Sequence, residues 1–446
     1  MQGTPRKELS LLDSTCLIVG IIIGVGIYQV APGVAKGTGN GWGFLAIWLV
    51  GGVLSLCGAL GYAELATAYP REGGDYVYLS RAYGRWAGFL FGWVQLAVVR
   101  PGDIAAMAFA FATYGAALYD PLPTGDHTLT LRLYAGAAVV VLTAINILGV
   151  RAGKWAQNLL TIVKGLGLLA IVAVAVMAPA SRGTPVTFEP LPWSLALIFV
   201  LFTFGGWNEM AYVAAEVKNP RRSIVRALVL GTAAVTVLYL LVNGAFLYTL
   251  GYGGLATSEA AAAASIATVF PQGGGRIISA LVCLSALGAA NGLVFAGARI
   301  SYAVGTEHRA FRVLGQWHPR TGTPVRALAL QGAIAAGLIV LLGSFFDAIL
   351  YTAAAVYSFY LATSLAVIVL RFREPGVERP YRVTGYPIPT LVFCAVCAFL
   401  IYSAVTYKPW VAAAAGAILL LGLPIYRLST RWAAASARQE DGGGVP

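Results

Sequence analysis

Residues 22–28 read Ile-Ile-Gly-Val-Gly-Ile-Tyr and interrupt the first long apolar segment of the chain, residues 11–35. Glycine destabilises a helix interior by about 1 kcal/mol relative to alanine, and two glycines this close together favour unwinding. Unwound backbone at membrane depth is tolerated only where it lines a cavity or is buried in protein. We therefore expect a break in the helix at this point.

A second apolar segment, residues 192–215, carries a similar interruption, Phe202-Thr203-Phe204-Gly205-Gly206-Trp207-Asn208-Glu209. Glycine also serves close packing between membrane helices, and a single break would favour that interpretation. Here the breaks fall in the first and the sixth apolar segments. Matched breaks in two halves of a chain are typical of a transporter binding site, and they predict two inverted repeats of five helices each.

Twelve apolar segments run along the chain. They cover residues 11–35, 43–69, 86–115, 131–150, 155–178, 192–215, 225–250, 274–304, 325–343, 347–370, 387–407 and 410–427. A helix that spans a bilayer needs about 20 apolar residues, whereas a barrel strand needs about ten in alternation. The sequence therefore predicts an all-α integral membrane protein with about 12 transmembrane helices.

The composition agrees with this class, because 59% of the residues are hydrophobic and only 11% are charged. Soluble proteins are about 25% charged. We expect a single membrane domain over residues 1–446. Within it, the two repeats cover 11–178 and 192–370, two additional helices occupy 387–427, and a disordered tail covers 432–446.

The basic residues predict the orientation. The net charge is +12, and with the N-terminus inside, 23 of the 30 Lys and Arg residues fall on the cytoplasmic side. Two lie inside apolar segments, and the five on the other side are Lys36, Arg132, Arg182, Arg276 and Lys408. By the positive-inside rule both termini are cytoplasmic. This asymmetry explains the charge without a nucleic-acid partner.

The two breaks can bind a zwitterion without charged side chains. The N–H groups of Gly24, Val25 and Gly26 can hold a carboxylate at the start of a half-helix. Carbonyl groups of Ile22, Phe202 and Gly205 are candidates for an ammonium group. Gly205 and Gly206 add no bulk, so that the remaining pocket is small-walled and apolar, which favours neutral α-amino acids.

Several short motifs occur in a characteristic order. They are Gly-Val-Gly-Ile-Tyr at 24–28, Tyr-Ala-Glu-Leu at 62–65, Gly-Gly-Asp-Tyr at 73–76, Arg-Pro at 100–101, Phe-Thr-Phe-Gly-Gly-Trp-Asn at 202–208, Glu-Val-Lys-Asn-Pro-Arg-Arg at 216–222 and Glu-Arg-Pro at 378–380. Through them nearly the whole chain resembles the amino acid–polyamine–organocation (APC) superfamily. Its greatest similarity is to the L-type amino acid transporters of the light-chain branch.

This resemblance implies the LeuT-type fold and sodium-independent transport of neutral L-amino acids by alternating access, with exchange as the expected mode. Proton-coupled symport is the alternative. Phe202 would be a gate, and Trp207 and Asn208 would lie near the substrate. The predicted substrate-binding residues are Ile22, Gly24, Val25, Gly26, Ile27, Phe202, Gly205, Gly206, Trp207 and Asn208.

The resemblance also gives a role to Lys164, about a dozen residues into its apolar segment. In this family its ammonium group occupies the place of a sodium ion and braces helix one against helices five and eight. A lysine that snorkels to the interface is the structural alternative. Asn291, on helix eight, is a possible neighbour of Lys164.

The chain departs from the family pattern at three places. Val25 replaces a small hydroxyl residue, which removes one side-chain hydrogen bond to the carboxylate. Gly205 stands where relatives that carry dibasic amino acids have an acid, which again predicts neutral substrates. The segment 120–125 lacks the cysteine through which animal members join a glycoprotein, so that no disulfide-linked heavy chain is expected.

Three further charged residues lie in or beside apolar segments. Glu209 follows the second break, where it could take part in proton coupling or amine selection, or face a hydrated vestibule without a role. Arg100 and Asp103 are three residues apart and can pair with each other. We interpret that pair as structural.

Nothing in the sequence predicts an enzyme, a metal site or a cofactor. His127, His308 and His318 fall in predicted loops, and neither HExxH nor GxxxxGK[ST] occurs. Cys394 and Cys397 form a C-x-x-C pair on an apolar segment without nearby histidines or acids, which indicates packing. A sensor built on a transporter fold would keep the binding residues, but we expect a transporter because these 446 residues contain no segment that we interpret as a signalling domain.

Overall fold

The structure, a computed structural model, describes residues 11–70, 74–121, 127–148, 154–181, 186–208, 220–308, 311–316, 318, 321 and 323–442. Within these residues the regular structure is helical. The elements are α1 (Leu11–Ile22), α2 (Gly26–Gln29), α3 (Ala31–Lys36), α4 (Gly41–Ala68), α5 (Asp75–Tyr83), α6 (Arg85–Val94), the π-helix η1 (Gln95–Val99), α7 (Arg100–Leu118), α8 (His127–Ile147), α9 (Lys154–Met177), α10 (Trp193–Thr203), α11 (Pro220–Thr257), α12 (Ala261–Ala267), α13 (Gly274–Glu307), α14 (Val325–Leu342), α15 (Phe345–Arg373), α16 (Ile388–Tyr407) and α17 (Pro409–Gly442).

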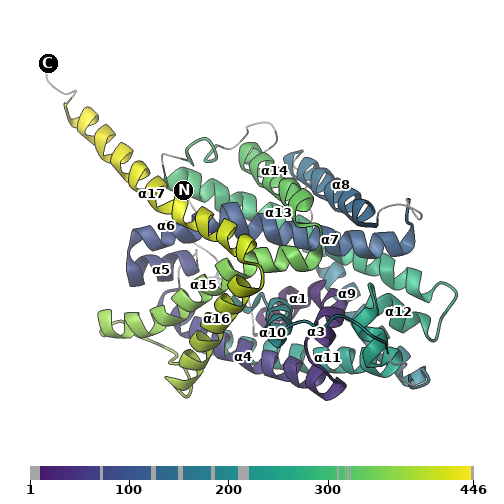
Figure 1. Cartoon of the computed structure of the whole chain (residues 1–446). Coiled ribbons are helices and arrows are strands. Elements are labelled where there is room, and N and C mark those ends of the chain that lie inside the picture. Colours follow the sequence, from purple (N-terminus) through teal and green to yellow (C-terminus); the bar gives the residue numbers. More distant parts are fainter. Residues whose placement is uncertain are drawn as a thin grey trace.

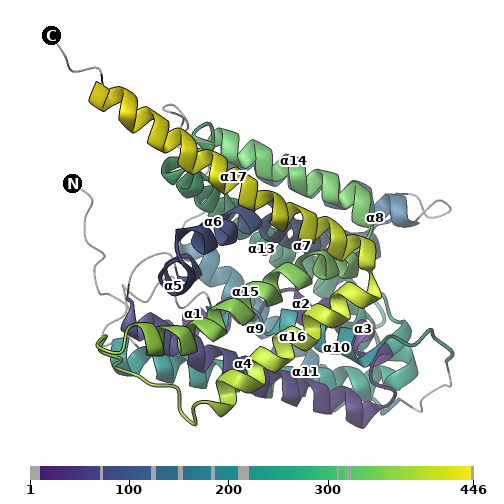
Figure 2. The same ribbon diagram turned by 60° about the vertical axis from the view of Figure 1, so that its left-hand side comes forward.

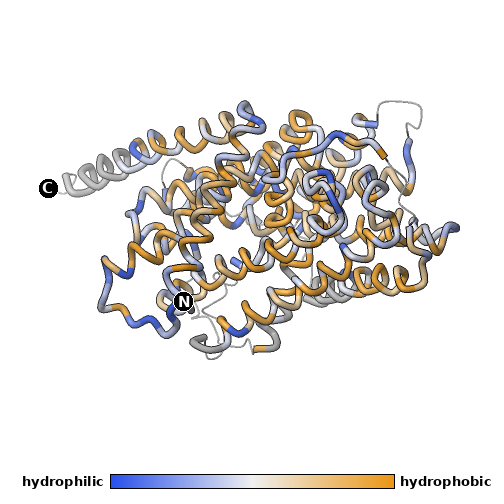
Figure 3. The backbone as a smooth tube through the Cα atoms, turned by 60° about the horizontal axis from the view of Figure 1, so that its bottom comes forward, coloured by the Kyte–Doolittle hydropathy of each residue, from blue (hydrophilic) through white to orange (hydrophobic). Residues whose placement is uncertain are grey.

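Nine helical stretches in the described part of the chain are long and apolar enough to cross a membrane. All twelve predicted segments contain helix, which confirms the all-α membrane class. Hydrophobic residues run along the helices and hydrophilic ones gather in the connections (Figure 3). Large apolar side chains such as Val140, Val176 and Leu341 point outwards and are more than 60% exposed, as expected for contact with lipid.

The first apolar segment is interrupted where its glycines lie. Helix α1 ends at Ile22, residues 23–25 are not helical, and α2 begins at Gly26. A tight hydrogen bond from the Gly24 N–H to the Ile22 carbonyl, at 2.7 Å, closes the end of α1. The predicted break is therefore present.

The second interruption begins at the end of α10. The Gly205 N–H donates to the Phe202 carbonyl at 3.0 Å. Gly206 has a φ of +107°, a backbone conformation that residues other than glycine rarely adopt. Trp207 and Asn208 form a short 3₁₀ turn, and residues 209–219 lie outside the described part of the chain.

The two breaks lie against each other inside the bundle, where α1, α2 and α10 are surrounded by longer helices (Figures 1 and 2). A Cβ atom on Gly26 would meet the Thr203 hydroxyl oxygen at 3.1 Å. The Tyr239 hydroxyl on α11 lies 2.8 Å from the Ile22 carbonyl oxygen and 3.3 Å from that of Thr203. One buried hydroxyl therefore connects the ends of both half-helices.

Two details differ from a simple arrangement of straight helices. The third segment contains the π-helix η1, a feature often found at functional sites. Helix α17 extends away from the bundle and continues to Gly442, into the segment expected to be disordered (Figure 1). Residues 433–435 and 437 in this extension are alanines, which favour helix without tertiary contacts.

Candidate functional site

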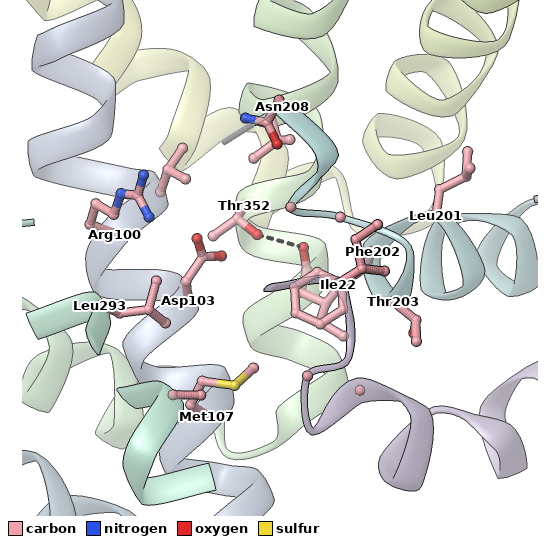
Figure 4. A pocket seen from close by; sticks show the side chains of 18 of the residues that line it. Ile22, Arg100, Asp103, Met107, Leu201, Phe202, Thr203, Asn208, Leu293 and Thr352 are labelled. Carbon is pink, nitrogen blue, oxygen red and sulfur yellow. Dashed lines mark hydrogen bonds between the residues drawn. The ribbon is translucent and has the colours of Figure 1, made fainter. Parts of the chain in front are cut away.

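A cavity of about 440 Å³ lies where the two breaks meet the middle of the bundle. The breaks form one side, and α7, α13 and α15 supply much of the remaining wall (Figure 4). This volume is within the range of small-molecule sites. The cavity is therefore the candidate binding site.

Most of the predicted site residues line this cavity. They are Ile22, Gly24, Val25, Gly26, Phe202, Gly205, Gly206, Asn208 and Lys164. They come from α1, α2, α9, α10 and the segments that follow the half-helices, so that residues more than 140 positions apart meet at one site. The aromatic ring of Phe202 packs at right angles to that of Phe345, with ring centroids 6.0 Å apart.

Other predicted residues lie away from the cavity wall. Ile27 is fully buried, and the Trp207 ring packs edge-on against Tyr62, 5.0 Å between centroids. The Asn291 side chain accepts a hydrogen bond from Asn146 on α8 at 2.7 Å. These three residues support the packing around the site. Glu209 lies outside the described residues.

Three of the backbone groups expected to bind substrate have partners within the protein, and one of them is the Phe202 carbonyl, which accepts from the Gly205 N–H. The Ile22 carbonyl oxygen accepts from the Gly24 N–H and from the Tyr239 hydroxyl, which occupies both of its lone pairs. In this conformation neither the Ile22 carbonyl nor the Gly24 N–H needs a ligand. Substrate recognition by these groups would require exchange of those partners.

Lys164 lies on the cavity wall and is only 6% exposed. Its backbone carbonyl accepts from the Tyr28 hydroxyl on α2 at 3.0 Å. The Tyr114 hydroxyl on α7 in turn donates to the Tyr28 carbonyl at 2.7 Å. These bonds join α9, α2 and α7 directly behind the first break.

A further part of the cavity wall, which the sequence analysis did not predict, is formed by small residues of α13. They are Gly288, Ala289, Gly292 and Ala296. Gly288 and Gly292 are four residues apart, a small-x-x-x-small spacing that permits close approach of other groups. This pattern is visible in the sequence and could have identified the wall.

Charged and polar side chains also line the cavity where the sequence suggested only structural roles. Arg100 and Asp103 of α7 both extend into it (Figure 4), and Gln95 joins them from η1. Asp75 is 1% exposed, and its carboxylate accepts from the Tyr62 and Thr363 hydroxyls at 2.5 and 2.7 Å. The cavity is thus more polar than expected from its glycines.

Comparison with known proteins identifies the family. The model of the amino acid permease family matches residues 9–423. The b(0,+)-type amino acid transporter 1 of Mus musculus is 32% identical over 95% of this chain and 88% of its own length. The serine/threonine exchanger SteT of Bacillus subtilis is 31% identical, over 94% of this chain and 96% of its own length.

A third relative is the large neutral amino acids transporter small subunit 2 of Rattus norvegicus. It is 31% identical over 96% of this chain and 81% of its own length. These proteins are transporters and not enzymes, which agrees with the absence of a catalytic motif. The described cysteines Cys57, Cys283, Cys394 and Cys397 form no disulfide. Match and fold together show that this chain belongs to the amino acid permease family of multi-span membrane transporters, within the APC superfamily.

Proposed function

We propose that this protein transports neutral L-amino acids across the cell membrane, without sodium, by alternating access and in exchange for a second amino acid. The observation that carries the proposal is the meeting of two glycine-broken helices, at 22–26 and 202–206, on one cavity. Such breaks present backbone N–H and carbonyl groups to a zwitterion.

The substrate's charged ends are assigned to these breaks. The carboxylate is held by the N–H groups that begin at Val25 and Gly26, and the ammonium by carbonyls near Phe202 and Gly205. Ile22, Gly206 and Asn208 complete this end of the site. Ile27 and Trp207 support it from behind. Because Gly205 provides no acid, a second positive charge on the substrate has no partner at this position.

Lys164 replaces a coupling ion. A lysine in the bilayer core is costly and usually functional, and this one lies beside the cavity behind the first break. Its fixed positive charge would stabilise the carbonyl ends that sodium stabilises in ion-coupled transporters. Asn291 supports α13 through Asn146, and Phe202 serves as the gate over the substrate.

The proposed topology has about 12 spans. It contains a LeuT-type pair of inverted repeats at 11–178 and 192–370, two further helices at 387–427, and cytoplasmic termini in a single domain. No disulfide-linked heavy chain is included, since the segment 120–125 contains no cysteine. Cysteine labelling at Gln2 and Ser436, from either side of sealed vesicles, tests the orientation.

Uptake into proteoliposomes tests the function. We expect labelled neutral amino acids to enter only vesicles preloaded with unlabelled amino acid, at a rate that is independent of sodium and of a proton gradient. Uptake into empty vesicles that increases with an acidic exterior would instead show proton-coupled symport. No uptake of any amino acid under either condition would contradict the proposal.

A further inference from the structure

Two charged side chains of α7 face the cavity across from the broken helices. Arg100 and Asp103 lie about one turn apart, Met107 follows one turn later, and all three line the cavity. Figure 4 shows the Asp103 carboxylate extending from α7 toward the side of the cavity that holds Ile22 and Phe202. Charges at membrane depth are costly and are usually kept for a function.

We propose that Asp103 selects the substrate side chain. Its carboxylate accepts a hydrogen bond from a hydroxyl or amide group of the substrate, so that the site prefers small polar neutral amino acids to their aliphatic isosteres. This inference rests on the proposed function, because it assumes that the α-carboxylate and ammonium groups bind at the breaks.

The geometry of the cavity directs the side chain of a substrate bound at the breaks toward Asp103. A substrate whose charged ends lie at 22–26 and 202–206 must direct its side chain away from them, toward α7 and α13. Near Asp103 the neighbouring wall is formed by Met107 and Leu293, which offer no strong acceptor (Figure 4). A carboxylate has about four acceptor positions, so that it can bind a substrate donor while it keeps contacts within the protein.

The charges of the cavity favour a neutral side chain over a cationic one. The described wall carries two basic side chains, Arg100 and Lys164, and two carboxylates, Asp75 and Asp103. A zwitterion with a neutral side chain preserves this balance. A cationic side chain that reached Asp103 would also approach Arg100, one turn away on the same helix.

Such a site should discriminate strongly between substrates that have a hydrogen-bond donor and analogues that lack it. An acceptor placed for a donor disfavours an analogue without the donor, because the polar group then loses its partner on desolvation. Threonine and valine differ by one hydroxyl in place of a methyl group and have almost the same shape. They therefore isolate the contribution of the hydrogen bond from that of size.

The experiment measures competition by threonine and by valine against labelled substrate in proteoliposomes that contain the full chain. We expect threonine to compete at least about tenfold better than valine. In Asp103→Leu this preference for threonine over valine should fall to about twofold or less. Threonine should bind more weakly, whereas valine should bind equally well or more strongly. Asp103→Asn, which retains an acceptor oxygen, should keep part of the preference. The control Asp120→Asn removes a carboxylate outside the cavity and should leave the ratio unchanged.

Equal competition by threonine and valine in the natural protein, or an unchanged ratio in Asp103→Leu, would overturn the inference. Thermal stabilisation of the purified protein by each amino acid gives a second measure that needs no transport. Failure of transport with a threonine preference retained in this binding assay would refute the proposed function alone. Efficient exchange of both amino acids without discrimination would refute the role of Asp103 alone.

Discussion

The Glu64 carboxylate on α4 accepts hydrogen bonds from Nε and Nη2 of the Arg371 guanidinium on α15, at 2.8 and 2.5 Å. The Arg379 Nε lies 3.6 Å from the same carboxylate, and the backbone N–H of Val383 donates to it at 2.7 Å. Glu64 is only 1% exposed. One buried carboxylate therefore joins α4, the end of α15 and the segment that follows.

Substitution of this carboxylate should destabilise the protein. Glu64→Gln leaves two guanidinium groups, whose side chains are 20% and 7% exposed, without their buried counter-charge, and loss of one partner of a buried ion pair costs about 3–5 kcal/mol. We expect a clearly lower thermal unfolding temperature in detergent. The control Glu259→Gln changes a side chain that is 77% exposed and should have almost no effect. Equal unfolding temperatures for Glu64→Gln and the natural protein would contradict this account.

Gly206 should not tolerate a side chain. Its φ of +107° places it where other residues are strained by about 1–3 kcal/mol. Gly206→Ala is expected to distort the second break and to weaken amino acid binding by about tenfold, as measured by competition in proteoliposomes. Gly136→Ala is a suitable control, because a Cβ there has no atom within 4 Å. Unchanged binding in Gly206→Ala would show that this backbone conformation is not required.

Lys164→Met tests the brace behind the first break. Removal of its positive charge from the cavity wall should lower the initial rate of exchange by about tenfold or more in sodium-free vesicles, since the carbonyl ends lose a stabilising cation. Lys36→Gln, a charge removed at the end of α3, serves as the control. Full exchange activity in Lys164→Met would eliminate the proposed role.

The contact between Glu374 and Arg81 predicts a small dependence of stability on pH. Burial raises the pKa of Glu374, but hydrogen bonds from Arg81 and Tyr69 outweigh it and lower the pKa below its ordinary value. A carboxyl with a lowered pKa stabilises the folded state above its ordinary pKa, near 4.3, and loses that contribution as the pH falls further.

Glu374→Gln should therefore lower the unfolding temperature slightly at pH 7, by no more than the effect of about 1 kcal/mol expected for an exposed pair. Near pH 3 the difference from the natural protein should become smaller. Thermal unfolding of both proteins at the two pH values measures this. A difference that grows on acidification would have the wrong sign for the proposed linkage.

The sequence located the two breaks because glycine acts locally. Its lack of a Cβ atom weakens the helix at 24–26 and at 205–206 whatever surrounds it, and the structure has interruptions at both places. The helical membrane class followed from segment length and composition for a similar reason, since a bilayer requires about 20 apolar residues wherever they occur.

The roles of the polar residues could not be obtained in this way. Arg100 and Asp103 have a spacing that suits a pair on a helix surface, but only the packing of α7 against the breaks turns them toward the cavity. The hydrogen bond between Asn291, a possible neighbour of the lysine, and Asn146 on another helix could not be read from the sequence either. Helix rotation decides which face meets which neighbour, and it depends on all contacts of the helix together.

By itself, the sequence determined that this chain forms membrane helices, that two of them break at glycines, and that its motifs are those of amino acid transporters. Only the tertiary structure decided which motifs meet: Tyr62 with Asp75, and Glu64 with Arg379 from the Glu-Arg-Pro motif. The physical reason is the sequence distance over which each effect acts. Backbone propensity and burial in lipid act within one segment, whereas a buried carboxylate needs partners that folding brings from more than 300 residues away.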